Sequence, residues 1–405
     1  MLKEYQDKFA HKKSKHLNLK VVKPTETENK ITLIKNISKI ILMTRHLIII
    51  ISLMLSLSAH AQQRVIDATD SIPVSVASIF DFDGNVVGYT LADGTFSDVP
   101  ETAYPITIRC LGYEPLVIAE PKDTVWQMKQ CFYDMPELVI VPGERNVMKQ
   151  ILYIRNYFSL CNEIDTVTHF VEEMAYRYVP AIEGEKIGIG SQIHNSNCRS
   201  FSMHKVGDLD SVAYEENSKS FILTSTLTNL SSKEILVHES LKNDSTGYYE
   251  KKGKSGLTLV QRLSNGVFTF KEDLLADKKN HTLSPWPLKL LGFTLEINQF
   301  YTTNAFSINE NGKYYPKDLL EAGFMMEAEG RGKYIRMALD SKTPVTVRTM
   351  TEIYVVGRDL LTLEEAKEEM DKKDPKMDFI IPSNVPALNE ATRRLVERAK
   401  AKAGK

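Results

Sequence analysis

Short runs of strand-forming residues, separated by turn residues, dominate this chain from Arg64 onwards and constrain its fold more than any other feature. The first runs are residues 73–80, 86–90 and 95–96, with Asp83-Gly84-Asn85 and Ala92-Asp93-Gly94 between them. Asp-Gly pairs between such runs favour tight hairpins. With the runs that follow as far as residue 141, the number of strands comes near the seven that a sandwich of two sheets needs. We therefore predict a β-sandwich over residues 62–142.

Three segments of this region form a recognisable set: residues 73–77 (PVSVA), residues 90–96 (TLADGTF) and Leu111-Gly112-Tyr113. Together they resemble the carboxypeptidase regulatory-like domain, a transthyretin-like or immunoglobulin-like sandwich. The resemblance implies a tight turn at Gly94, which tolerates a positive φ, and a core position for Phe96. It also implies an accessory module without catalytic residues. Such modules lie near the N-terminus of exported and outer-membrane proteins of Gram-negative bacteria, TonB-dependent receptors among them.

The segment that begins at Met43 has the three parts of a secretory signal. Arg45 supplies the charge, residues 47–57 are apolar, and Ala59-His60-Ala61 offers small residues at positions −3 and −1. We expect cleavage before Gln62, a leader and signal peptide over residues 1–61, and a true start at Met43. Because no second long apolar run follows, we expect no transmembrane segment after cleavage. No cysteine stands at the cleavage point, which argues against a lipid-anchored lipoprotein.

The break at Pro142-Gly143 marks the end of the sandwich. After it, four apolar residues recur at helical spacing and predict a linking helix over residues 143–162. They are Val147, Ile151, Ile154 and Phe158. Residues 163–358 return to strand-like runs, which predict a β-rich domain with a curved antiparallel sheet. Along residues 345–354 apolar and polar residues largely alternate, so one face of that strand is expected to meet water.

Residues 359–405 are predicted to be helical. Thr362 precedes Glu365 at capping-box spacing. Within residues 386–402 one stripe is apolar, and the cations of the last turns suit the helix dipole. The apolar stripe consists of Leu388, Ala391, Leu395 and Ala399. The whole chain is thus expected to be mainly β, with a sandwich, an α+β second domain and peripheral helices.

The charge of the expected mature chain argues against nucleic-acid binding. Of the 51 Lys and Arg residues 11 lie in residues 1–61, and of the 52 Asp and Glu residues only four do, which leaves 40 cations and 48 anions in residues 62–405. A net negative chain is poorly suited to hold phosphates.

Four cysteines, Cys110, Cys131, Cys161 and Cys198, would reach a compartment where disulfides persist. Four cysteines allow three pairings, and the pair most consistent with one small domain is Cys110 with Cys131. The alternative is that these residues are buried thiols that act as small apolar side chains.

Two sets of residues have conceivable metal-ligand spacing. His169 and Glu172 form an H-x-x-E pair that the distant His281 would complete, as in a zinc hydrolase of the carboxypeptidase type. However, the pair lies in a run that predicts an edge strand, where residues three apart point to opposite faces. The second set, His194, Cys198 and His204, lacks a further ligand, and its Ser- and Asn-rich surroundings indicate a surface loop. We therefore expect no catalytic, cofactor-binding or metal-binding residues.

Five Asp-Ser or Asp-Thr pairs resemble the O-glycosylation site of exported proteins in some Gram-negative bacteria. The expected acceptors are Ser71, Thr124, Thr166, Ser211 and Ser245. A glycan would mark exposed loops. The alternative is that each Asp begins a turn through a hydrogen bond from its side chain to the backbone.

The sequence thus favours a non-enzymatic exported protein of the cell envelope, in the periplasm, at the outer membrane or outside the cell, with an accessory sandwich and a β-rich binding or scaffold domain. Its expected partner is an envelope protein, a glycan or an apolar ligand. The alternatives are a zinc-dependent hydrolase and an accessory of a TonB-dependent outer-membrane receptor.

Overall fold

The protein divides into two compact units, Met1–Ala61 and Gln62–Lys405. The computed structural model describes residues 39, 41–45, 63–97, 99–131, 145–162, 165–182, 185–189, 193–216, 235–236, 248–253, 256–262, 267–273, 275, 294–307, 313–331, 344–372, 376–381 and 385–404. In the first unit the described residues are helical. No helix among the described residues has the length and apolar character needed to cross a bilayer.

The second unit begins with two small sheets that pack face to face. One has the strand order β4-β1-β7 and the other β3-β2-β5-β6. The strands are β1 (Gln63–Asp67), β2 (Ser78–Phe80), β3 (Val86–Tyr89), β4 (Thr95–Phe96), β5 (Ile106–Arg109), β6 (Leu116–Ile118) and β7 (Val125–Met128), with the 3₁₀ turn η1 (Glu101–Ala103) before β5. The predicted sandwich is therefore confirmed. The run predicted as a strand at residues 138–141 lies outside the described residues.

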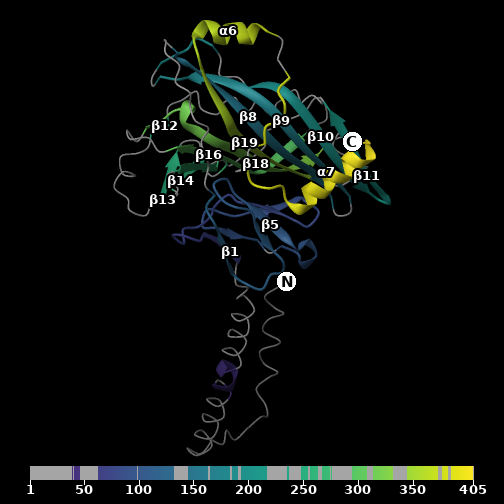
Figure 1. Cartoon of the computed structure of the whole chain (residues 1–405). Coiled ribbons are helices and arrows are strands. Elements are labelled where there is room, and N and C mark those ends of the chain that lie inside the picture. Colours follow the sequence, from purple (N-terminus) through teal and green to yellow (C-terminus); the bar gives the residue numbers. More distant parts are fainter. Residues whose placement is uncertain are drawn as a thin grey trace, which may run out of the picture. The chain divides into compact units, whose positions relative to one another are not determined.

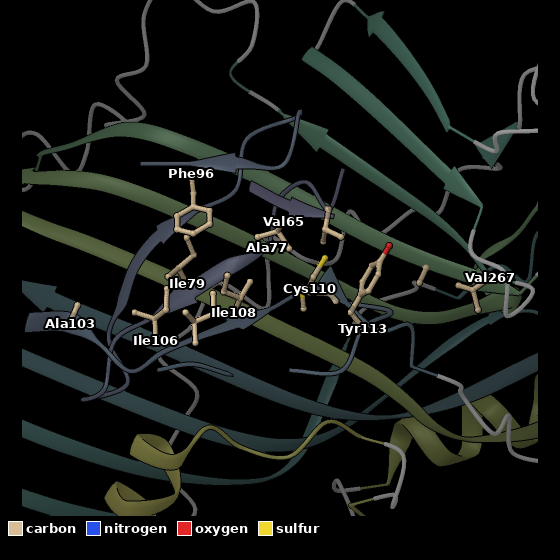
Figure 2. Close-up of a cluster of buried hydrophobic side chains, with 14 of the residues drawn as sticks. Val65, Ala77, Ile79, Phe96, Ala103, Ile106, Ile108, Cys110, Tyr113 and Val267 are labelled. Atoms are coloured by element: carbon tan, nitrogen blue, oxygen red, sulfur yellow. The ribbon is translucent and has the colours of Figure 1, made fainter. Parts of the chain in front are cut away.

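The sandwich core is apolar, and the acid Asp67 is buried with it. Phe96 and Ile79 lie in the core shown in Figure 2, as the position of Phe96 in the motif led us to expect. Asp67 is fully buried, and it accepts hydrogen bonds from Tyr113 Oη at 2.9 Å and Gln130 Nε2 at 2.7 Å. A buried carboxylate needs such donors, because desolvation otherwise disfavours its charge.

A ten-stranded curved sheet follows, in the order β11-β10-β9-β8-β19-β18-β16-β15-β14-β13 (Figure 1). Every neighbouring pair in it is antiparallel. Its strands are β8 (Val147–Cys161), β9 (Thr166–Pro180), β10 (His194–Val206), β11 (Leu209–Glu216), β13 (Tyr248–Gly253), β14 (Gly256–Arg262), β15 (Val267–Asp273), β16 (Thr294–Ser307), β18 (Leu319–Arg331) and β19 (Val345–Leu361). A two-stranded sheet pairs β12 (Ile235–Leu236) with β17 (Lys313–Tyr314), and the 3₁₀ turn η3 (Pro316–Asp318) precedes β18. The predicted mainly β fold with a curved antiparallel sheet is confirmed.

The linking helix predicted over residues 143–162 is wrong. Residues Val147–Cys161 form the strand β8, which pairs with β9 on one side and β19 on the other. Both faces of this central strand are buried, so both carry apolar residues. The spacing of these apolar residues along the sequence is therefore similar to that of a helix. Val147 and Ile151 lie on one face, whereas Ile154 and Phe158 lie on the other.

Strand β19 was expected to have one face in water, and this expectation is wrong. Its first residues alternate between buried and half-buried positions, but every side chain from Thr349 to Tyr354 is buried. On one face this stretch packs against other elements, and on the other its apolar side chains join a buried cluster of the sheet, so neither face meets water.

The sandwich and the large sheet share a core instead of forming separate domains. Val267, Ala305 and Leu320 of the large sheet join the core cluster of the sandwich. Gly323 of β18 faces Leu111 of the sandwich, whose Cδ1 atom lies 3.1 Å from where a Cβ would stand. Residues 62–142 and 163–358 are thus parts of one compact unit.

Two helices complete the unit, α6 (Leu363–Asp371) and α7 (Glu390–Lys402). The predicted capping box begins α6, where the Glu365 amide donates to Thr362 Oγ1 at 3.1 Å and the Thr362 amide donates to Glu365 Oε2 at 2.8 Å. Helix α7 begins after Asn389, whose Oδ1 accepts from the Thr392 amide at 2.7 Å, and not at residue 386.

Candidate functional site: a buried charged cluster beneath the sandwich

The large sheet has two faces with different neighbours. On the first, which we name the sandwich face, Phe80 of the sandwich contacts Tyr157 with ring centroids 5.3 Å apart, and Leu395 of α7 joins the same cluster. Ala366 of α6 packs against Tyr176 and Tyr178 on this face as well. We name the opposite side the far face.

An arginine of the sandwich reaches into the sandwich face and meets a glutamate there. Arg109 Nη2 lies 3.0 Å from the carboxylate of Glu352, and its Nη1 donates to Tyr157 Oη at 3.1 Å. Both charged side chains are almost completely buried, with 2 % and 3 % exposed. Burial is the largest influence and pulls the pKa of Arg109 down, but Glu352, Tyr157 and Tyr354 together outweigh it and raise that pKa above its ordinary value. Arg109 is therefore charged, and its burial depends on the partner carboxylate.

A second group continues the cluster across β8, β9 and β10. Tyr153 Oη donates to Glu172 Oε1, and Arg199 Nε lies 2.6 Å from Glu172 Oε2. Arg155 joins the two groups, because its Nε donates to Tyr153 Oη at 3.1 Å and its Nη1 lies 4.0 Å from Glu352. Burial raises the pKa of Tyr153, so this phenol stays protonated and acts as a donor.

The segment before α7 covers the cluster from the solvent side. We name residues 376–381 and 385–388 the C-terminal strap. Arg155 Nη1 donates to the Pro386 carbonyl at 2.5 Å, and Arg109 Nη1 donates to the Ala387 carbonyl at 3.3 Å. The guanidinium of Arg199 stacks on the Phe379 ring at 4.1 Å from its centroid.

This arrangement is suited to holding three parts of the chain together. Its two acids, Glu172 and Glu352, each face an arginine, and both are buried. The sandwich, the sheet and the strap each contribute to the same network of charge-assisted hydrogen bonds, which are stronger than neutral ones. The cluster acts as a joint, since its groups are engaged with one another.

The far face contains an apolar cluster with a polar trio in its middle. A buried cluster runs over β15, β16, β18, β19, β8 and β9 on this face. In its middle, Thr351 Oγ1 donates to Asn156 Oδ1 at 2.7 Å, and Asn156 Nδ2 donates to Glu173 Oε1 at 3.1 Å. The apolar members are Leu152, Ile154, Ala175, Phe268, Phe270, Phe306, Leu319, Ala322, Phe324 and Ile353. All of these apolar side chains are buried, so the cluster is a core inside the curved sheet.

The structure does not form the first predicted metal set. His169 and Glu172 lie on opposite faces of β9, and Glu172 is held by Tyr153 and Arg199. His281 lies outside the described residues. Strand β9 is not the predicted edge strand, because it pairs with both β8 and β10. Burial lowers the pKa of His169, and the neighbouring His204 acts in the same direction.

The structure does not bring His194, Cys198 and His204 together either, and the surface loop predicted for this segment is wrong. Residues His194–Val206 form β10, because pairing with β9 and β11 outweighs the weak strand preference of Ser and Asn. His194 stacks on Tyr176 at 5.3 Å on the sandwich face, whereas Cys198 and His204 lie on the far face. In the described part of the chain, no three His, Cys, Asp or Glu residues are grouped so that they could hold a metal ion.

The predicted disulfide between Cys110 and Cys131 is absent, and all four cysteines are thiols in the structure. Cys110 Sγ accepts a hydrogen bond from Lys271 Nζ at 3.4 Å and lies 3.8 Å from the Ser75 carbonyl oxygen. Burial raises the pKa of the Cys110 thiol, although Lys271 acts in the opposite direction. This thiol is therefore packed and protonated, which lowers its reactivity.

We expect alkylation of the purified, denatured and unreduced protein to label all four cysteines. Intact mass measures the number of labels, and the same protein after reduction is the control. A mass two labels short, with a cross-linked peptide that joins Cys110 and Cys131, would contradict the structure.

The predicted glycosylation positions differ in exposure. Ser71 and Thr124 are exposed on the sandwich, Thr166 and Ser211 are half-buried in β9 and β11, and Ser245 lies outside the described residues. Asp70 supports the alternative, because its Oδ1 accepts from the Ile72 amide at 2.9 Å and so begins a turn.

The sequence alone did not indicate that Arg109 and Glu352 form a buried pair. Arg109 and Glu352 are 243 positions apart, so no local spacing connects them. The available signal was a charged residue inside an apolar strand, as in Ile106–Arg109. Such a residue is buried only with a partner.

Comparison with protein families finds no match, and no characterised protein matches the sequence. A solved structure titled "Lipid-protein interactions in lipovitellin" aligns with a TM-score of 0.29 at 10 % identity. The alignment covers 54 % of this chain and 26 % of that chain. A likeness this weak carries no argument about fold or function.

Proposed function

We propose that this chain is an exported, non-enzymatic protein of the cell envelope, in which the sandwich is an accessory module and the curved sheet is a binding or scaffold domain. The partner in this proposal is an envelope protein, a glycan or an apolar ligand. The resemblance of residues 73–113 to the carboxypeptidase regulatory-like domain and the signal-like segment before Gln62 support it.

The buried joint between Arg109 and Glu352 is the observation on which the proposal mainly depends. A flexible appendage needs no buried ion pair with its neighbour, whereas a brace that keeps a binding sheet in shape benefits from one. Lys271 of β15 adds a second connection, since its Nζ donates to the Ser75 carbonyl of the sandwich at 2.6 Å. The far face is the side of the sheet that the sandwich does not contact, and its apolar side chains form a separate buried core.

The hydrolase alternative receives no support from the described residues, because His169 and Glu172 cannot reach one ion from opposite faces of β9. A more specific form of the proposal is that the protein is an accessory of a TonB-dependent outer-membrane receptor. Co-purification of the tagged protein with such a receptor from solubilised outer membranes tests it.

Export is tested by expressing the protein in a Gram-negative host and determining its N-terminal residue. We expect the envelope fraction to contain a chain that begins at Gln62. Ala61→Phe places a bulky residue at position −1 and is expected to leave the leader attached, whereas the control His60→Phe changes position −2 and is expected to be cleaved normally. Uncleaved protein in the cytosol of the wild type would refute the proposal.

A further inference from the structure

The structure brings together one histidine from each of the two metal sets that the sequence kept apart. His169 of β9 and His204 of β10 lie with ring centroids 5.9 Å apart and planes inclined by 76°. In the register of the two strands, Ser202 stands opposite His169 and Val167 stands opposite His204. The two rings are therefore diagonal neighbours on the far face.

Both rings are half-buried, so solvent reaches them at the end of the sheet formed by β9, β10 and β11. Phe158 flanks His169 with its ring centroid 6.1 Å away. Because both histidines sit on paired strands, the backbone ladder holds their Cα atoms in place. A ligand that joins the rings would lose little conformational entropy.

The separation of the two ring centroids falls within the range that one metal ion allows for two imidazole ligands. Imidazole nitrogen binds zinc at about 2.0–2.1 Å, which places two rings on one ion with centroids roughly 5 to 6 Å apart. Imidazole suits copper, nickel and zinc, and Cu²⁺ binds most tightly in this series. Carboxylate-preferring ions such as Ca²⁺ and Mg²⁺ would find no advantage here.

We propose that His169 and His204 bind one divalent transition-metal ion, with water in the remaining positions, and that this ion fastens β10 to β9. The ion sits on the far face, whereas Glu172 points to the sandwich face and takes no part. The site therefore differs from the zinc-hydrolase set in both its ligands and its place. It also stands independently of the proposed export and scaffold function.

The test is a Cu²⁺ titration of the purified protein, followed by electron paramagnetic resonance of the bound ion. We expect one equivalent of Cu²⁺ with nitrogen couplings from two imidazoles and a rise in melting temperature. His169→Gln and His204→Gln are each expected to weaken binding at least tenfold. The matched control His194→Gln changes a histidine stacked on Tyr176 on the other face and is expected to bind like the wild type.

Ser202→His serves as a gain-of-function variant, because it adds an imidazole directly opposite His169. We expect it to bind Cu²⁺ more tightly than the wild type, which keeps the test informative if a glutamine variant folds poorly. Unchanged binding in both glutamine variants, or couplings from a single imidazole in the wild type, would overturn the proposal. Loss of binding in Glu172→Ala alone would point to the hydrolase set instead.

Discussion

Arg109→Met is expected to lower the free energy of unfolding by about 3–5 kcal/mol, the range for breaking a buried ion pair on one side. The substitution keeps the apolar stem but leaves the carboxylate of Glu352 buried without its nearest cation. Tyr157 loses its donor at the same time. Because Arg155 stays 4.0 Å from Glu352, we expect the lower part of the range. Urea unfolding of the purified protein at pH 7, followed by circular dichroism, measures the effect.

Two variants make this result specific to the pair. Adding Glu352→Gln to Arg109→Met removes the stranded charge and is expected to recover part of the stability. Arg393→Met removes an exposed arginine of α7 that pairs with Glu390, and is expected to change nothing measurable. A loss in Arg109→Met no larger than that in Arg393→Met would show that the joint does not stabilise the protein.

Gly94→Ala is expected to lower the free energy of unfolding by about 3 kcal/mol, through both backbone strain and overpacking. Gly94 has a φ of +78°, and a Cβ there would lie 2.4 Å from the Val65 carbonyl oxygen. That carbonyl belongs to β1, whose Val65 amide donates to the Gly94 carbonyl at 2.8 Å. The turn therefore cannot move away from the strand without losing a hydrogen bond.

Gly207→Ala separates the two causes. Gly207 also has a positive φ, +56°, but no atom lies within 4 Å of where its Cβ would stand. We expect only backbone strain to act there, and it should lower the free energy of unfolding by about 1–2 kcal/mol. Thermal and urea unfolding of both variants give the comparison. Equal losses in the two variants would mean that the close approach to Val65 has no energetic consequence.

The turns of the sandwich were predictable because their hydrogen bonds are local. Asp93 Oδ1 accepts from the Thr95 amide at 3.0 Å and from Thr95 Oγ1 at 2.6 Å, all within the motif itself. The capping box at Thr362 is local in the same way. Such contacts involve residues two or three positions apart, so the order of residue types is enough to indicate them.

Strand β8 and the charged joint were not predictable on this basis. The apolar positions of β8 imitate a helix because neighbours cover both of its faces, and those neighbours are distant in sequence. Arg109 and Glu352 are charged residues that a sequence would place at the surface, yet they are buried because each finds the other. The same holds for His169 and His204, whose meeting depends on the register between β9 and β10.

The residues alone determined the class of the protein: strand-forming runs and Asp-Gly turns specify a mainly β chain with a sandwich after the first 62 residues, since these preferences act over a few positions. The tertiary structure decided how the sandwich and sheet share one core, which charges are buried together and which histidines become neighbours. Those outcomes depend on pairing between strands that are far apart in the sequence, such as β8 with β19, and on the free energy gained when both faces of a strand are covered at once.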